Sequence, residues 1–225
     1  MVTGQAGPGE TCPIREQLMQ DVPVYILTVT IWAYWIGAAI MVVRVRKMIC
    51  RLPGVVPEQR LERLMWLIWI PLVILWLVLP FLAITQRHGL LAVPEPVLTH
   101  SGLVMLRWAA SLVGVACLLV TIDCWVRMGK NWRMGVVPDQ TTELVTDGLY
   151  SRIRHPIYAF SVLFMLCSVA VIPTIPMAAV ATIHTALMIL KAHNEERFLL
   201  QTYGKRYADY CRRTGRFFPR LVLRR

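Results

Sequence analysis

The sequence has few charged residues. Of its 225 residues, 16% are charged and 56% are hydrophobic, whereas a soluble domain has roughly 25% charged residues. In water, a surface with so few charges would leave large apolar areas uncovered. The shortage of charge therefore argues against a soluble protein and predicts one that lipid surrounds. A chain of this length is by default one domain.

Acidic residues are especially scarce. The chain has 13 Asp and Glu against 24 Lys and Arg, which gives a formal net charge of +11. Such an excess can indicate nucleic-acid binding. Here, however, the basic residues stand beside long apolar runs, as the charges that flank membrane spans do. No nucleic-acid partner is therefore expected.

Paired cysteines and glycine fingerprints are also lacking. The six cysteines form no CxxC pair, so neither a disulfide framework nor a metal site is expected. The glycine-rich stretch at residues 4–9 follows no predicted strand, and the dinucleotide-binding glycine pattern occurs nowhere, which argues against a soluble Rossmann-type enzyme. Residues 1–21 lack the apolar core of a signal peptide.

Long apolar runs, by contrast, are abundant. A membrane-spanning helix needs about 20 apolar residues, and five runs approach or reach this length. They cover residues 24–43, 64–84, 102–122, 156–172 and 176–190. We therefore predict an all-α, polytopic helical membrane protein with about five spans. Residues 1–225 would form one membrane domain, with three spans in residues 1–122 and a helical hairpin plus a C-terminal segment in residues 123–225.

Lysine and arginine residues predict the orientation. The N-terminus and the loop at 85–101 hold one basic residue each, and the link at 173–176 holds none, whereas the other two loops and the C-terminal tail are rich in them. Basic loops stay in the cytosol, so the N-terminus is predicted outside the cytosol and the C-terminus inside. Arg107 lies within the third span but near its outer end, and we expect it to snorkel to the interface.

Two polar segments adjoin the last two spans. Residues 144–158 lead into the fourth span, and residues 191–200 follow the fifth. The link between these spans, residues 173–176, is so short that the spans must lie side by side. Their cytosolic ends must therefore also be close. The residues brought together in this way are Arg154, His155, Tyr158, Lys191, Glu195 and Glu196.

This cluster suits a zwitterionic ligand that carries an aromatic ring. Carboxylates can accept hydrogen bonds from an ammonium, and basic groups can hold a carboxylate. Aromatic rings can stack on a purine or face a sulfonium. S-adenosyl-L-methionine has all of these parts, although the residue types alone leave other ligands open.

The order of the motifs resembles a known family. The string Gly-x-Tyr-x-x-x-Arg-His-Pro-x-Tyr at 148–158 is similar to the signature of the isoprenylcysteine carboxyl methyltransferase and phospholipid methyltransferase superfamily. In that family a short helical hairpin, a Glu-Glu pair and an aromatic segment follow, as they do here at 195–196, 203–210 and 217–219. The resemblance covers about residues 125–220.

The resemblance implies S-adenosyl-L-methionine as the cofactor, in a pocket at the cytosolic ends of the last spans that the C-terminal segment closes. Together with Arg154 of the same cluster, it implies a set of cofactor-binding residues. These are Leu144, Val145, Tyr150, Arg154, His155, Pro156, Ile157, Tyr158 and Glu195.

Four residues are candidates for catalytic roles. In the isoprenylcysteine enzymes a basic residue one turn before the glutamate approaches the substrate carboxylate, which implies Lys191 here. That family residue is an arginine, and lysine offers only a point charge in place of its bidentate grip. An amine acceptor would also need a base, for which His155, His193 and Glu196 are candidates.

The expected function is membrane methyl transfer from this cofactor to a lipidic or amphiphilic acceptor, with membrane lipids as the other partners. An isoprenylcysteine-type carboxylate, methylated on oxygen, is the first candidate. N-methylation of a phospholipid amine and S-methylation of a thiol are alternatives. A sterol-type reductase that uses NADPH and a non-catalytic membrane protein are the alternatives of other classes.

Overall fold

A computed structural model of the chain describes residues 13–50, 54, 59–86, 88–135 and 143–220. It is a helical membrane protein, as predicted. Four helices are long and apolar enough to cross a membrane, and a fifth, α5, is apolar but has 16 residues. The expectations for the glycine-rich stretch and for most of the signal-peptide region concern residues 1–12, outside the described part.

The helices follow the predicted spans closely in the middle of the chain and less closely at the ends. The long helices are α1 (Pro13–Ile49), α2 (Arg60–Thr85), α4 (Ser101–Met128), α5 (Pro156–Val171) and α6 (Ile175–Tyr203). Short helices complete the described part: α3 (Glu95–Thr99), η1 (Gly129–Asn131), η2 (Gly148–Ser151) and α7 (Lys205–Arg213).

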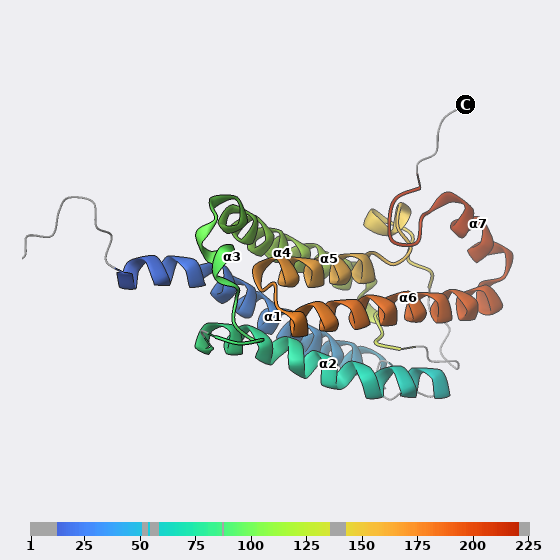
Figure 1. The fold of residues 1–225 in the computed structure, drawn as a ribbon. Coiled ribbons are helices and arrows are strands. Elements are labelled where there is room, and N and C mark those ends of the chain that lie inside the picture. Colours follow the sequence, from blue (N-terminus) through green and yellow to red (C-terminus); the bar gives the residue numbers. More distant parts are fainter. Residues whose placement is uncertain (1–12, 51–53, 55–58, 87, 136–142, 221–225) are drawn as a thin grey trace, which may run out of the picture.

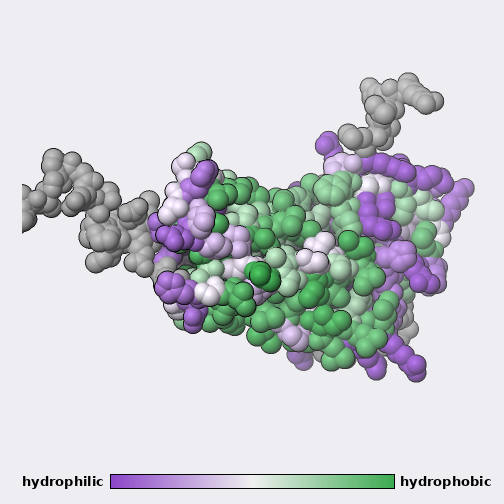
Figure 2. All heavy atoms as spheres, in the orientation of Figure 1, coloured by the Kyte–Doolittle hydropathy of each residue, from purple (hydrophilic) through white to green (hydrophobic). Residues whose placement is uncertain are grey.

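The long helices lie side by side in a bundle, and α7 lies at the end where α6 finishes (Figure 1). Large apolar side chains such as Leu67, Met105 and Phe81 are exposed on the outside of the bundle. Hydrophobic residues form a broad band between two hydrophilic ends (Figure 2). Lipid accounts for this surface, because water would not tolerate so large an apolar band.

Helices α5 and α6 form the predicted tight hairpin. Only residues 172–174 separate them, and the Thr174 side chain caps α6 by accepting a hydrogen bond from the Met177 amide at 3.4 Å. Helix α6 does not stop at residue 190 as the expected span did. With 29 residues it is about 43 Å long, and the hydrocarbon core is about 30 Å thick. The polar segment after residue 190 is therefore a rigid helical extension of the last span.

The three N-terminal spans pack directly on this hairpin. The Trp76 indole of α2 donates a hydrogen bond to the Ser168 hydroxyl of α5 at 3.0 Å. A Cβ atom on Gly37 would lie 2.9 Å from the Trp125 ring, and one on Gly114 would lie 3.1 Å from the Phe164 ring. These two glycines let α1 and α5 approach α4 closely, so both halves of the chain share one core.

Arg107 does not snorkel, and that prediction was wrong. Its side chain is 1% exposed, and its Nε donates a hydrogen bond to the Val171 carbonyl at 3.0 Å. The carbonyls of the last turn of α5 have no partner within their helix, and Asp21 of α1 supplies a buried countercharge. Arg107 therefore joins α1, α4 and α5 inside the bundle.

Replacing Arg107 with leucine should destabilise the protein strongly. Removing one partner of a buried charge pair costs about 3–5 kcal/mol, which corresponds to a drop of roughly 6–20 °C in unfolding temperature at this chain length. Thermal unfolding in detergent measures the effect. Arg46→Leu is the control, because Arg46 is exposed near the other end of α1. Equal unfolding temperatures for the two variants would show that the buried contacts of Arg107 contribute no stability.

Candidate active site

A cavity of about 230 Å³ lies where α5 begins and α6 leaves the bundle. A single water needs about 10–15 Å³, so this space can admit part of an organic molecule. All nine residues expected to hold the cofactor line it: Leu144, Val145, Tyr150, Arg154, His155, Pro156, Ile157, Tyr158 and Glu195. Lys191 lines it as well.

The N-terminal spans supply the opposite wall, which the sequence motifs did not predict. Tyr34 and Trp35 of α1, Trp69 of α2 and Trp125 of α4 all line the cavity. The eight tryptophans of the chain were the signal that could have revealed this wall. Their spacing, however, does not show which of them face a cavity and which face lipid. The site therefore lies between the two halves of the chain.

Several buried polar atoms of the cavity residues have no hydrogen-bond partner within the described part of the chain. They include the indole nitrogens of Trp35 and Trp69 and the hydroxyl of Tyr150. Buried polar groups in native proteins are almost always paired. The cavity thus offers donors and aromatic faces to a polar ligand, which fits a cofactor with a purine, a ribose and an amino acid group.

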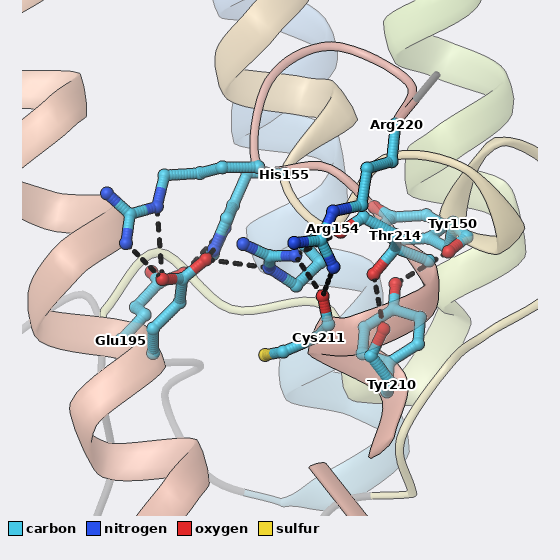
Figure 3. Close-up of polar contacts among 10 residues, drawn as sticks. Tyr150, Arg154, His155, Glu195, Tyr210, Cys211, Thr214 and Arg220 are labelled. Carbon is cyan, nitrogen blue, oxygen red and sulfur yellow. Dashed lines mark hydrogen bonds and ion pairs between the residues drawn. The ribbon is translucent and has the colours of Figure 1, made fainter. Parts of the chain in front are cut away.

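The motif residues Gly148 and Tyr150 hold the loop before α5 in place through close contacts with α4 and α7. Gly148 has φ of +56°, and a Cβ atom there would lie 3.0 Å from the Arg127 guanidinium. The Tyr210 hydroxyl of α7 donates a hydrogen bond to the Tyr150 carbonyl at 2.6 Å (Figure 3). Burial raises the pKa of Tyr210 to about 12, so this donor keeps its proton at neutral pH.

Glu195 faces the cavity. The Tyr158 hydroxyl donates a hydrogen bond to its Oε1 atom, and the His155 Nδ1 atom lies 3.6 Å from its Oε2 atom. The rings of His155 and Tyr158 are stacked, with centroids 5.4 Å apart and planes 5° apart. The start of α5 therefore fixes both the position and the hydrogen bonding of this carboxylate.

Glu196 does not line the cavity, and its Oε1 atom lies 3.4 Å from the His155 Nε2 atom. Its Oε1 atom accepts a hydrogen bond from Arg154 Nε at 2.8 Å, and its Oε2 atom accepts from Arg216 Nε at 3.0 Å and Nη2 at 2.5 Å. Glu196 in turn raises the pKa of Arg216. His193 is exposed and also lies outside the cavity lining. Of the three candidate bases, only His155 reaches the cavity.

The C-terminal segment folds back over this region. The amides of Arg154 and His155 donate to the carbonyls of Gly215 at 2.8 Å and Arg216 at 3.0 Å, and the Gly215 amide donates to the Arg152 carbonyl at 3.0 Å. Arg154 also donates to the carbonyls of Cys211, at 3.2 Å, and Thr214 (Figure 3). Residues 214–216 therefore form a parallel bridge beside the start of α5.

Gly215 is required at its place in that bridge. A Cβ atom there would lie 1.7 Å from the Phe218 carbonyl oxygen, so the chain can turn back only because residue 215 has no side chain. The turn brings the Phe217 ring within 6.2 Å of the His155 ring. The C-terminal segment thus lies against His155. This is the end of the bundle that the sequence predicts to face the cytosol.

Lys191 lies on the side of the cavity that faces the N-terminal spans. Its ammonium donates a hydrogen bond to the Met134 carbonyl. It also lies over two aromatic rings, 5.8 Å from the Trp69 centroid and 5.6 Å from the Tyr158 centroid. A cation in this position is stabilised by the negative faces of both rings.

The helical bundle thus brings this motif cluster together around the cavity at one of its ends. Residues 104–206 match the sequence profile of the family described as phospholipid methyltransferase. This part of the chain is therefore similar to the isoprenylcysteine and phospholipid methyltransferase superfamily. The resemblance predicted from the motifs is confirmed, although the aromatic block at 217–219 lies beyond the matched residues.

Two curated bacterial proteins are similar to part of the chain. A nickel-cobalt-cadmium resistance protein of Alcaligenes xylosoxydans xylosoxydans is 36% identical over 116 residues, which are 51% of this chain and 53% of that protein. A cobalt-zinc-cadmium resistance protein of Cupriavidus metallidurans is 41% identical over 100 residues, which are 44% of this chain and 46% of that protein. The chain thus spans about half the length of the curated relatives it matches.

The contacts of Glu196 predict a structural effect of its removal. Glu196→Ala would leave Arg154 and Arg216 without their shared carboxylate. Hydrogen bonds to charged groups are worth about 1.5–3 kcal/mol each, so amide exchange at Arg154 and Gly215 should become at least about tenfold faster. Hydrogen-exchange mass spectrometry measures this rate.

Asp209→Ala is the matched control, because Asp209 pairs with the exposed Arg212 on α7. An exposed pair contributes about 0–1 kcal/mol, so exchange at residues 154 and 215 should hardly change in this variant. Unchanged exchange in Glu196→Ala would mean that other contacts hold the C-terminal segment in place.

Proposed function

We propose that the chain is an S-adenosyl-L-methionine-dependent membrane methyltransferase that acts on an amphiphilic acceptor. The observation that carries this proposal is the shared cavity, which nine motif residues and Lys191 line together. In the proposed orientation, the cavity lies at the cytosolic end of the bundle, and the cofactor is dissolved in the cytosol. The apolar wall from α1, α2 and α4 continues into the membrane, where an amphiphile resides. Both halves would work as one domain.

Distinct parts of the cavity would hold distinct parts of the cofactor. Glu195 would accept hydrogen bonds from the ammonium of the amino acid group, because its carboxylate faces the cavity with one strong donor, Tyr158, already in place. Tyr150 offers a buried hydroxyl. Leu144 and Val145 would pack against the purine. The layer of His155, Phe217 and the segment 214–216 would exclude water.

The bound cofactor would supply a methyl group on a sulfonium, which a nucleophile can displace directly. Positioning and exclusion of water can then provide most of the catalysis. A carboxylate or thiolate acceptor needs no base. For an acceptor that must lose a proton, His155 is the candidate base, because it lines the cavity and neither His193 nor Glu196 does.

An isoprenylcysteine-type carboxylate remains the first candidate acceptor, because Lys191 places a positive charge beside an apolar aromatic wall. A thiol acceptor is the second candidate. The names of the relatives connect those proteins with resistance to cobalt, nickel, zinc and cadmium, and thiolates bind soft metal ions. Methylation of either acceptor would remove an anionic metal ligand, so we propose metal resistance as the cellular setting.

Cofactor binding provides the first test. Calorimetry on detergent-purified protein should show micromolar binding of S-adenosylhomocysteine and no binding of NADPH. His155→Ala should weaken binding at least about tenfold, while His193→Ala should not change it, because only His155 lines the cavity. Binding of NADPH alone would favour a reductase. Binding of neither ligand would favour a non-catalytic membrane protein.

The acceptor can be identified by the stability of its methyl group. Membranes of a metal-sensitive bacterial host that expresses the chain should incorporate radioactive methyl from labelled S-adenosyl-L-methionine, and membranes with the His155→Ala variant should not. Release of volatile methanol in alkali would identify a methyl ester, whereas alkali-stable label would identify an S- or N-methyl product. The same host should tolerate cobalt and cadmium better with the wild-type chain than with the variant. Equal tolerance would contradict the proposal that the chain acts in metal resistance.

A further inference from the structure

One face of α2 points at Lys191. Glu62, Met65, Trp66 and Trp69 recur at spacings of three and four residues, which place them on one side of the helix. All four line a second, small cavity of about 20 Å³, and Lys191 lines it from the α6 side. A space of that size holds about one water. Trp69 and Lys191 also line the main cavity, so the two spaces share a wall.

Glu62 is the charged residue of this face. Its side chain is 1% exposed, and a Cβ atom on Gly135 would lie 2.9 Å from its Oε2 atom. Gly135 follows Met134, whose carbonyl accepts the hydrogen bond from Lys191. The start of α2 is also tied to α6, because the Asn194 side chain donates to the Gln59 side chain at 2.9 Å. Glu62 is therefore held firmly in the wall beside Lys191.

The surroundings of Lys191 leave its ammonium little water. Trp69 and Tyr158 lie under it, and Met134 accepts one of its hydrogen bonds. Two carboxylates attract it, Glu195 on its own helix and Glu62 on α2, while a protonated His184 would repel it. A buried ammonium needs such countercharges, because burial favours its neutral form. Glu195, however, is engaged by Tyr158 and is assigned to the cofactor in the proposed function.

We propose that Glu62 is a positioning residue of the active site, whose carboxylate keeps the Lys191 ammonium charged on the acceptor side of the cavity. The N-terminal half, which carries no family signature, would then set the charge that the acceptor meets. A charged Lys191 offers a carboxylate or thiolate a matching cation, and a neutral one does not. This inference rests on the proposed function only in that it takes the Lys191 side of the cavity to be where the acceptor binds. The charge of Lys191 can be measured without any acceptor.

Lysine acetylation tests the charge directly. Acetic anhydride reacts with an amine only when the amine is unprotonated, and peptide mass spectrometry can follow each lysine over a pH series. In the Glu62→Gln protein, the pH of half-maximal labelling at Lys191 should fall by about one unit or more. Glu62→Asp should keep it near the wild-type value. Lys47, Lys130 and Lys205 are exposed and serve as internal references that should not move.

Glu95→Gln is the matched control, because Glu95 is exposed on α3 in another loop. An unchanged labelling profile of Lys191 in Glu62→Gln would overturn the proposal. Binding of S-adenosylhomocysteine, measured on the same samples, reports on the proposed function separately. If the wild-type protein does not bind S-adenosylhomocysteine, the proposed function is wrong, but the labelling result for Lys191 still stands.

A double-mutant cycle covers the case in which Glu62→Gln folds poorly. If Glu62 acts mainly as the countercharge of Lys191, then Glu62→Gln should lower the unfolding temperature clearly less in a Lys191→Met background than in the wild type. An equal loss of stability in both backgrounds would mean that Glu62 supports the fold independently of Lys191, and the proposal would fail.

Discussion

The site depends on the three-residue turn between α5 and α6. A link of residues 172–174 leaves the two helices no choice but to run antiparallel and in contact. The start of α5 and the far end of α6 therefore lie side by side, although His155 and Glu195 are 40 positions apart in the sequence. The ion pairs and the cavity at that end are possible only because this turn fixes which residues face each other.

The two glutamates on the helical extension of α6 make different contacts. Successive residues on an α-helix point about 100° apart, so the two adjacent carboxylates leave α6 in different directions, although both lie near the His155 ring. Glu195 points into the cavity, and Glu196 points toward Arg154 and Arg216. One carboxylate is left for a ligand, while the other holds the C-terminal segment over the same cavity.

The N-terminal spans do more than anchor the chain in lipid. Their aromatic side chains form one wall of the cavity, and Arg107 and Trp76 fix them to the hairpin from inside the bundle. In a membrane, buried polar contacts and close packing at small residues, such as that at Gly37 and Gly114, replace the hydrophobic effect as the forces that join helices. The family profile begins at residue 104, so Tyr34, Trp35 and Trp69 of this wall lie outside the matched residues.

The sequence by itself determined which segments form the long apolar helices, the hairpin and the motif side of the site, but not where the first and last of these helices end. Length and apolarity are local properties, and a four-residue link constrains its neighbours without help from the rest of the chain. Nine cofactor candidates could be named because their motifs resemble those of the family, and because the short turn predicts that the opposite ends of α5 and α6 lie together. The roles of those residues stay predictions.

Only the tertiary structure decided the direction of individual side chains. Snorkelling was the sensible expectation for Arg107, since the sequence gives no hint that Val171 and Asp21 lie within its reach. Likewise, residue types alone do not show which carboxylate of the Glu195-Glu196 pair lines the cavity, and they do not distinguish a lipid-facing tryptophan from Trp69 in the cavity wall. These choices depend on how helices distant in the sequence rotate against one another. That rotation is set by packing of the whole bundle, which no local segment encodes.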